Sequence, residues 1–429
     1  MPTEHRDIFD TTDDVYLSPE EVFVPPSATT AVFKAEAARF PPLHYAMCAI
    51  STLNLAYRGQ QSLEQALQHY HRALSTVTTA TTPDDLISDG VFLRHFLLFV
   101  YDTCVPTDTG SGDDEMWAQH LNHLRQIAVQ RHDRLATEPY GYIMWSICEL
   151  DMYACLLGNG SCEFFRTIVQ LSMLPPLEHQ LPRVGFAAAG PFSPDEMRIM
   201  PTLLHLNQGV LIHTAKLAQV AQQYRAEHAA RRASASPGTY ARWQAKVSQA
   251  QSELVGFWNR SWPEFLGPEA PQAGYSLPHR ARYTVEHAMY IYQAAVLYVR
   301  TTMFPGQRLI PIANQADIHI DTERRCQFIL TMASADLERG LMERRHIVFP
   351  LLMAGFATTQ PDAKIQAINI MTAFQREGSI GQNTHRTRQL LVAVCEEQGA
   401  VVSAGGRMEQ VEWLALAKER GLSVVNCGL

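Results

Sequence analysis

The chain has 429 residues, of which 46% are hydrophobic and 18% charged, and its formal net charge at pH 7 is −8. A chain of this length can bury a large core, either in one extended helical domain or in two or three domains. The negative net charge gives no overall attraction to nucleic acid or to anionic membranes. No stretch reaches the roughly 18 uncharged apolar residues that a membrane span needs, so we expect no membrane partner.

The first 29 residues are acidic and contain prolines, and they lack the basic-then-apolar order of a signal peptide. We therefore expect a flexible acidic arm over residues 1–29, a single helical domain over residues 30–429, and a protein that stays inside the cell. Eight cysteines are scattered through apolar stretches, as reduced core cysteines are. Cys148, Cys155 and Cys162 recur at intervals of seven, but no histidine lies near them, so we expect no metal.

Helical spacing of apolar residues predicts the first two helices in PPLHYAMCAISTLNLAYRG (41–59) and QSLEQALQHYHRALSTV (61–77). Alanine at every turn allows two helices to approach closely, so the pair is interpreted as one antiparallel hairpin. The pattern does not return at a fixed period, which argues against a solenoid of repeats.

The next helix is predicted to start within TTPDDLISD (81–89) and to continue through GVFLRHFLLFVYDTC (90–104). Thr82 is the expected N-cap, and Asp84 and Asp85 complement the helix dipole. The alternative is a Mg²⁺–diphosphate site, because Asp84, Asp85 and Asp89 loosely resemble the carboxylate run of helical isoprenoid cyclases. In those enzymes the run ends an apolar helix. Here it begins one, which favours capping.

A nearly continuous apolar helix is predicted over YGYIMWSICELDMYACLLG (140–158), with Glu149 and Asp151 in its middle. Carboxylates are rarely buried alone, because desolvation costs several kcal/mol. Two interpretations stay open: each carboxylate pairs with a basic side chain of another helix, or it lies at the edge of a pocket.

A long helix is predicted to begin after Ser193, which forms a capping box with Glu196. On this helix His205 and His213 are two turns apart and can share a face, but no third metal ligand is evident. A later helix, HRARYTVEHAMYIYQAAVLYVRTTMF (279–304), has tyrosines that suit either core packing or the wall of a ligand pocket. The candidate pocket residues are Trp145, Glu149, Asp151, His205, His213 and Tyr290.

Three sharply bounded helices are predicted in the segment from Arg344 to Cys395, after a long helix from Asp321 to Glu343. The first, from His346 to Thr358, is apolar almost all round and should be buried. The second begins at Pro361, a favoured first helical residue. The third runs from Thr387 to Glu397. The fold class is therefore all-α, with antiparallel helical hairpins around a central apolar helix.

Several of these segments together resemble the fungal-specific transcription factor domain, the helical regulatory region of zinc binuclear cluster regulators in fungi. The segments are SLEQALQHYHRALS, WSICELDMYACLLG, IVFPLLMAGFATT, GSIGQNTHRTRQLLVAVCEEQ and the closing EWLALAKERGLSVV. The resemblance covers roughly residues 40 to 425. The six closely spaced cysteines of that family's DNA-binding module are not found ahead of it, since the first cysteine is Cys48.

The resemblance implies a ligand-sensing or partner-binding regulatory protein, in the nucleus or the cytoplasm, that serves a metabolic or secondary-metabolite gene cluster and does not itself bind nucleic acid. Its implied partners are a small hydrophobic ligand, other transcription regulators or a second copy of the chain, with no cofactor. The alternative function is a secondary-metabolism enzyme, a cyclase or isomerase that uses an interior pocket and, for a diphosphate substrate, Mg²⁺. No common hydrolase or nucleotide-binding motif supports that alternative.

Overall fold

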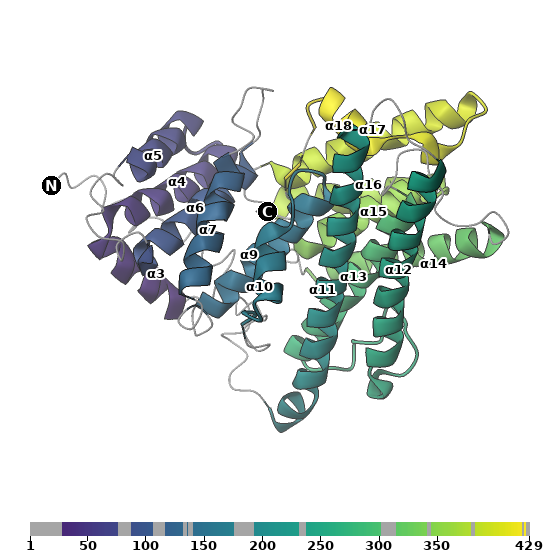
Figure 1. The fold of residues 1–429 in the computed structure, drawn as a ribbon, viewed down its shortest axis with the longest axis horizontal. Coiled ribbons are helices and arrows are strands. Elements are labelled where there is room, and N and C mark those ends of the chain that lie inside the picture. Colours follow the sequence, from purple (N-terminus) through teal and green to yellow (C-terminus); the bar gives the residue numbers. More distant parts are fainter. Residues whose placement is uncertain are drawn as a thin grey trace. The chain divides into compact units, whose positions relative to one another are not determined.

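The computed structural model describes eleven parts of the chain: residues 28–75, 87–105, 116–131, 135, 140–175, 193–230, 237–301, 315–340, 345–378, 382–422 and 424–425. Within these parts the chain forms fifteen α-helices and no strand, which confirms the all-α class (Figure 1). The predicted flexible arm lies almost wholly outside them.

The chain divides into two compact units. Unit 1 is Met1–Val105, Ser111–Ile147 and Leu171–Pro191, and unit 2 is Pro106–Gly110, Cys148–Gln170 and Phe192–Leu429. Helix α9 (Tyr140–Leu156) contributes its first half to unit 1 and its second half to unit 2. The single domain expected over residues 30–429 stays a prediction.

Unit 1 is built around helix α6 (Asp89–Cys104), in which only Asp89 and Asp102 are not buried. The other described helices of this unit are α3 (Ala28–Arg39), α4 (Pro41–Tyr57), α5 (Leu63–Ser75) and α7 (Met116–Gln130). Helix α4 packs against α5 and α6, and α6 packs against α7. The two helices predicted first in the chain therefore touch, while the wider architecture of antiparallel hairpins stays a prediction.

The start of α6 differs from the start that the sequence suggested. Ser88 is its N-cap, and the Ser88 hydroxyl accepts a hydrogen bond from the backbone N–H of Val91 at 3.4 Å. The expected cap, Thr82, lies outside the described residues. Serine is a somewhat better N-cap than threonine, and Ser88 immediately precedes the buried apolar run of α6.

Unit 2 has two buried central helices, α13 (His279–Thr301) and α15 (Val348–Ala357), which pack against each other. Every residue of α15 is buried, as its apolar sequence predicted. Around them lie α10 (Glu163–Gln170), α11 (Pro194–Ala230), α12 (Pro237–Ser261), α14 (Gln315–Glu338), α16 (Pro361–Gly378), α17 (Asn383–Ser403) and α18 (Trp413–Glu419), with 3-10 turns η6 (Glu264–Leu266), η8 (Arg345–Ile347) and η9 (Met408–Gln410).

Local chemistry explains where several of these helices begin and end. Ser193 and Glu196 form the predicted capping box at the start of α11, with hydrogen bonds of 2.9 and 3.2 Å. Helix α16 begins at Pro361 as predicted. Helix α14 ends at Glu338, earlier than predicted, because Gly340 has a φ of +69° and so supplies the left-handed residue that stops a helix.

Helix α17 is longer at both ends than the predicted range of Thr387 to Glu397. Its first residues, Asn383 and Thr384, are buried in unit 2 despite their polar side chains. Packing of this first turn therefore outweighs the weak helix propensity of the SIGQNT segment. The first residues of the predicted helix His346–Thr358 form the 3-10 turn η8, and α15 proper starts at Val348.

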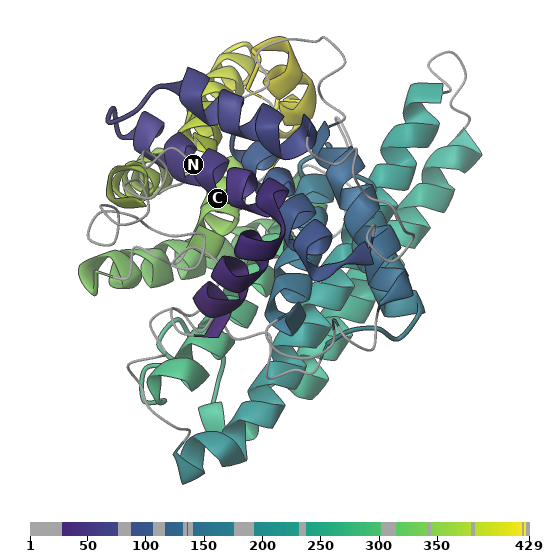
Figure 2. The ribbon, with the colours of Figure 1, turned by 90° about the vertical axis from the view of Figure 1, so that its left-hand side faces the viewer.

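The two longest helices of unit 2, α11 and α12, lie side by side in both views (Figures 1 and 2). Gly209 lets them approach closely: a Cβ atom added there would lie 1.9 Å from Cζ of Phe257. The ring of Phe257 thus fills the place that any larger residue at position 209 would occupy.

Candidate functional site

The six candidate pocket residues lie in different surroundings. Trp145 belongs to the part of α9 in unit 1, is 1% exposed, and its indole Nε1–H has no hydrogen-bond partner among the described residues. The other five belong to unit 2. The prediction that the six residues form one ligand pocket stays a prediction, and their individual contacts are as follows.

The two carboxylates of α9 differ in how they are stabilised. Asp151 is fully buried, and its Oδ2 accepts a hydrogen bond of 3.0 Å from the backbone N–H of Phe165, in the first turn of α10. A helix N-terminus is a favourable place for a carboxylate, because its N–H groups lack partners within the helix. Burial raises the pKa of Glu149 to about 8, so this side chain is mostly protonated at neutral pH.

His205 and His213 share a face of α11, as their spacing predicted, and both lie against the same aromatic ring. Their ring centroids are 5.9 and 5.1 Å from that of Phe257 on α12. Phe257 therefore fills the space between the two histidines, above Gly209. This packing accounts for the position of both rings. His205 is exposed, and Nδ1 of His213 is buried without a hydrogen-bond partner among the described residues.

Tyr290 is part of a group that we call the acid–arginine cluster: Glu286, Tyr290, Asp336 and Arg339. The first three are buried, and the Arg339 side chain is 27% exposed. The Tyr290 hydroxyl donates a hydrogen bond of 2.8 Å to Asp336 Oδ2. Arg339 Nη2 lies 2.5 Å from Asp336 Oδ1 and 3.5 Å from Glu286 Oε1. Both carboxylates have 0% exposed side chains. The cluster joins α13 to the end of α14.

The other tyrosines of α13 also have separate partners. Tyr292 stacks on Trp258 with ring centroids 4.1 Å apart. The Tyr298 hydroxyl donates to the carbonyl oxygen of Leu156 at 3.0 Å and accepts from Arg225 at 3.1 Å. These contacts are typical of aromatic core residues whose polar tips are satisfied.

The aspartates of the alternative diphosphate site can be followed only in part. Asp84 and Asp85 lie outside the described residues. Asp89 is ion-paired with Arg131, which follows α7, within unit 1. The magnesium–diphosphate interpretation therefore stays untested.

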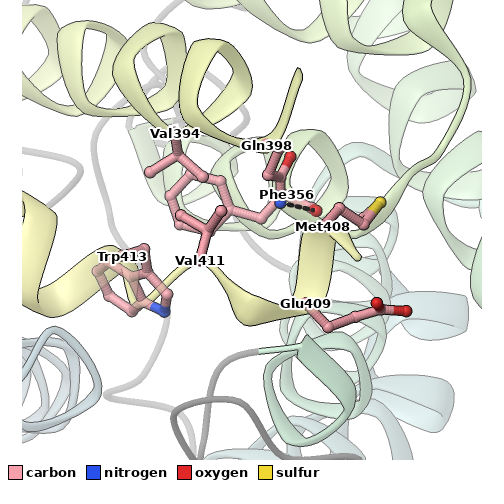
Figure 3. A pocket seen from close by; sticks show the side chains of 7 residues that line it. All are labelled: Phe356, Val394, Gln398, Met408, Glu409, Val411 and Trp413. Carbon is pink, nitrogen blue, oxygen red and sulfur yellow. Dashed lines mark hydrogen bonds between the residues drawn. The ribbon is translucent and has the colours of Figure 1, made fainter. Parts of the chain in front are cut away.

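A pocket that the sequence did not indicate lies in unit 2 between α15, α17 and the segment that leads into α18 (Figure 3). It is lined by Phe356, Val394, Gln398, Met408, Glu409, Val411 and Trp413, and its empty space, with the part open to solvent, is about 260 Å³. The ring centroids of Phe356 and Trp413 are 5.3 Å apart, so the two rings touch each other and form one aromatic wall.

The polar groups of this pocket differ in whether they have partners. The amide of Gln398 is held on both sides, since its Nε2 donates to the carbonyl of Phe356 at 3.0 Å and its Oε1 accepts from Lys364 at 2.6 Å. Trp413 is 3% exposed, and its indole Nε1–H has no partner among the described residues. In Figure 3 this nitrogen is on the side of the indole that faces the other lining residues. It is a hydrogen-bond donor that a bound molecule can use.

No local sequence signal pointed to this pocket. Phe356 and Trp413 are 57 positions apart in the chain, and each reads by itself as a buried apolar residue. Only the packing of the C-terminal segment on α15 and α17 brings them together.

The described residues contain no group of three or more histidine, cysteine, aspartate or glutamate side chains arranged to hold a metal ion. The seven cysteines in the described parts form no disulfide with one another, and all except Cys395 are buried, as predicted for core residues. Among the described helices, none is long and apolar enough to cross a membrane. Comparison of the chain with protein-family models, with curated proteins and with solved structures gave no match.

Proposed function

We propose that the chain is the regulatory part of a fungal transcription regulator and senses a small ligand in the pocket beside Phe356 and Trp413. One observation carries the proposal: the pocket forms where segments that carry the family resemblance meet. Phe356 belongs to IVFPLLMAGF, Val394 to the helix after GSIGQN, and Trp413 to EWLALAKERG. A pocket at this junction can couple ligand binding to the packing of the buried helix α15.

The lining of the pocket indicates what kind of ligand it takes. Its walls are aromatic and aliphatic, which favours an apolar molecule. The unpartnered Nε1–H of Trp413 favours a hydrogen-bond acceptor on that molecule. The carboxylate of Glu409 on the rim is paired with Arg407, whose Nε lies 3.4 Å from Glu409 Oε2, so the rim has no net charge from this pair. The space of about 260 Å³ includes open solvent, and the enclosed cavity volume is only about 10 Å³. This is far below the range of about 300–1,000 Å³ for drug-sized ligands, so a ligand can enter only when the lining side chains move apart.

In this proposal the chain acts with other transcription regulators, in the nucleus or the cytoplasm, and does not itself bind DNA. The gene targets belong to metabolism or secondary metabolism, as the resemblance implies.

The test is a tethering experiment in a fungal reporter strain. The full chain is fused to an unrelated DNA-binding module whose site lies ahead of a reporter gene. We expect reporter transcription to change several-fold when the fusion is bound, and to respond to extracts of small apolar metabolites. Trp413→Phe keeps an aromatic wall but removes the indole N–H, so it should abolish the response to extract while the folded protein persists.

Trp262→Phe is the matched control. Its indole Nε1–H donates to the carbonyl of Gly267 at 2.8 Å, away from the pocket residues. This variant should keep the response to extract. The purified chain is also incubated with the same extracts, and bound molecules are identified by mass spectrometry. A ligand recovered unchanged supports the proposal, whereas catalytic conversion of an apolar substrate would overturn it in favour of the enzyme alternative.

A further inference from the structure

A continuous chain of polar side chains lies inside unit 1, and neither the ligand pocket nor the family resemblance accounts for it. We call it the Arg94–Asp102 chain: Arg94, His95, His120, Asp102 and Tyr70. Arg94 Nη2 is 2.7 Å from His95 Nε2, and His95 Nδ1 is 3.0 Å from His120 Nδ1. His120 Nε2 is 3.5 Å from Asp102 Oδ2, to which the Tyr70 hydroxyl donates at 3.1 Å.

The direction of every hydrogen bond in this chain follows from Arg94. A guanidinium only donates, so His95 must accept at Nε2 and carry its proton on Nδ1. His95 Nδ1–H then donates to His120 Nδ1, which leaves the proton of His120 on Nε2, facing Asp102 and Tyr70. Each ring is a neutral imidazole with one donor and one acceptor. The chain thus joins a cation at one end to a carboxylate at the other through two neutral rings.

The chain is buried and ties together three helices. Arg94, His95 and Asp102 belong to α6, His120 to α7 and Tyr70 to α5. Arg94 is 3%, His95 6% and His120 3% exposed. Nε and Nη1 of Arg94 have no hydrogen-bond partner among the described residues. His95 is therefore the group through which the buried guanidinium connects to the rest of the chain.

The charged and titratable neighbours come from each helix around the chain. His123 of α7 stacks on His95 with ring centroids 4.7 Å apart. Burial, with repulsion from Arg94 and His123, lowers the pKa of His120 to about 3 and that of His95 further. Burial raises the pKa of Asp102 to about 7, against the hydrogen bond from Tyr70. On α4, Tyr57 contributes to the raised pKa of Tyr101, the neighbour of Asp102. Among the interactions of the described residues, no ionisable side chain of α3 shifts the pKa of a member of the Arg94–Asp102 chain.

We propose that the Arg94–Asp102 chain is an acid-sensitive switch, which holds α6 and α7 together while both imidazoles are neutral and breaks when either ring takes up a second proton. A second proton turns the acceptor nitrogen of the ring into a donor. On His95 that new N–H points at the guanidinium of Arg94, and on His120 it points at His95 Nδ1–H. Donor then faces donor, and a second positive charge is added beside Arg94 in a buried site.

The direction of the pH effect follows from proton binding in the closed and open forms. In the closed form the pKa values of His95 and His120 lie below their ordinary value of 6.5, so the open form binds more protons at these two rings. The closed form is therefore destabilised relative to the open form as the pH falls below 6.5. The pKa of Asp102 is raised from 3.8 to about 7 in the closed form, so the closed form binds the extra proton of this carboxyl. Between pH 7 and pH 5 the protonation of Asp102 therefore opposes the effect of the histidines. The combined effect of the two histidines exceeds the opposing effect of Asp102. The equilibrium constant for opening should therefore rise by roughly tenfold from pH 7 to pH 5.

The test is amide hydrogen exchange of the full chain at pH 7, 6 and 5, expressed as protection factors so that the intrinsic pH dependence of exchange is removed. The amides to follow are those of α6 and α7. We expect their protection to fall about tenfold from pH 7 to pH 5. The decisive variant is His120→Gln, because a glutamine can accept from His95 and donate to Asp102 but cannot take up a proton in this range.

In His120→Gln the remaining histidine and Asp102 nearly cancel, so protection in α6 and α7 should change less than about threefold over the same range. His71→Gln is the matched control, since His71 is an exposed residue of α5, and it should behave like the natural chain. An equal fall of protection in His120→Gln and in the natural chain would overturn the proposal. If His120→Gln does not fold, NMR titration of the natural chain decides: a His120 ring that titrates near 6.5 in the folded protein overturns the switch, and one that stays neutral to pH 5 supports it.

Discussion

The two units bury opposite charges in different ways. In unit 2 the acid–arginine cluster brings Arg339 into direct contact with Asp336, at 2.5 Å, with Glu286 at 3.5 Å. In unit 1 the guanidinium of Arg94 and the carboxylate of Asp102 are separated by two imidazole rings. Both arrangements join neighbouring helices, since Arg339 connects α14 to α13 and His120 connects α7 to α6.

The comparison shows how the group between two buried charges decides the response to acid. A guanidinium in direct contact with a carboxylate has no intermediate that changes roles near neutral pH. An imidazole is the side chain that changes from acceptor to donor between pH 5 and 8. We therefore expect unit 2 to depend on direct ion pairing and unit 1 to depend on the protonation of two rings.

The largest expected effect comes from breaking the direct pair. Asp336→Ala leaves Arg339 without its closest carboxylate and removes the acceptor of the Tyr290 hydroxyl. Loss of one partner of a fully buried ion pair costs about 3–5 kcal/mol. The Arg339 side chain is 27% exposed and keeps Glu286 at 3.5 Å, so we expect the lower end of that range, about 3 kcal/mol. The free energy of unfolding, measured by chemical denaturation, should fall by that amount. The exchange of the α13 and α14 amides should become correspondingly faster.

Asp195→Ala is the control for this prediction. Asp195 also pairs with an arginine three residues on, Arg198, but their side chains are 79% and 77% exposed. An exposed pair contributes about 0–1 kcal/mol, so unfolding should hardly change. Equal costs for Asp336→Ala and Asp195→Ala would show that burial does not set the strength of the cluster.

Contacts within one helical turn could be predicted from the sequence, whereas the contacts of the acid–arginine cluster and of the Arg94–Asp102 chain could not. The capping box of Ser193 and Glu196 and the start of α16 at Pro361 were predictable, because their partners lie within one helical turn. The shared face of His205 and His213 followed from helical spacing. Helical spacing could not predict their partner Phe257, because this residue is 44 positions beyond His213 and belongs to another helix. Asp336 lies 46 residues from Tyr290, and Arg94 and His120 meet only across two helices. Burial periodicity predicts which side chains face inward, but not which inward-facing polar groups meet.

Asp102 should weaken the acid response of unit 1, and its removal should therefore strengthen that response. Asp102→Asn keeps acceptors for His120 and Tyr70 but removes the one group whose protonation opposes the histidines. Without that opposition, the opening equilibrium of α6 and α7 should rise by roughly several hundredfold between pH 7 and pH 5, compared with about tenfold in the natural chain. Amide protection factors measure it. The same substitution at unit 2, Asp336→Asn, should leave the pH dependence of the α6 and α7 amides unchanged.

The smallest expected effect compares the two tyrosines that donate to these carboxylates. Tyr290→Phe and Tyr70→Phe each remove one hydroxyl, from Asp336 and Asp102 respectively, without a large change of shape. Each should lower stability by about 1.5 kcal/mol, the lower end of the range for a hydrogen bond to a charged group.

The Tyr70 hydroxyl lowers the pKa of Asp102, so it favours the ionised carboxylate. The cost of Tyr70→Phe should therefore be larger at pH 8 than at pH 6, where Asp102 is mostly protonated, as measured by protection of the α6 amides. A cost that is the same at both pH values would mean that Asp102 does not change its protonation within this range, and the opposing role given to it in the acid response of unit 1 would then be wrong.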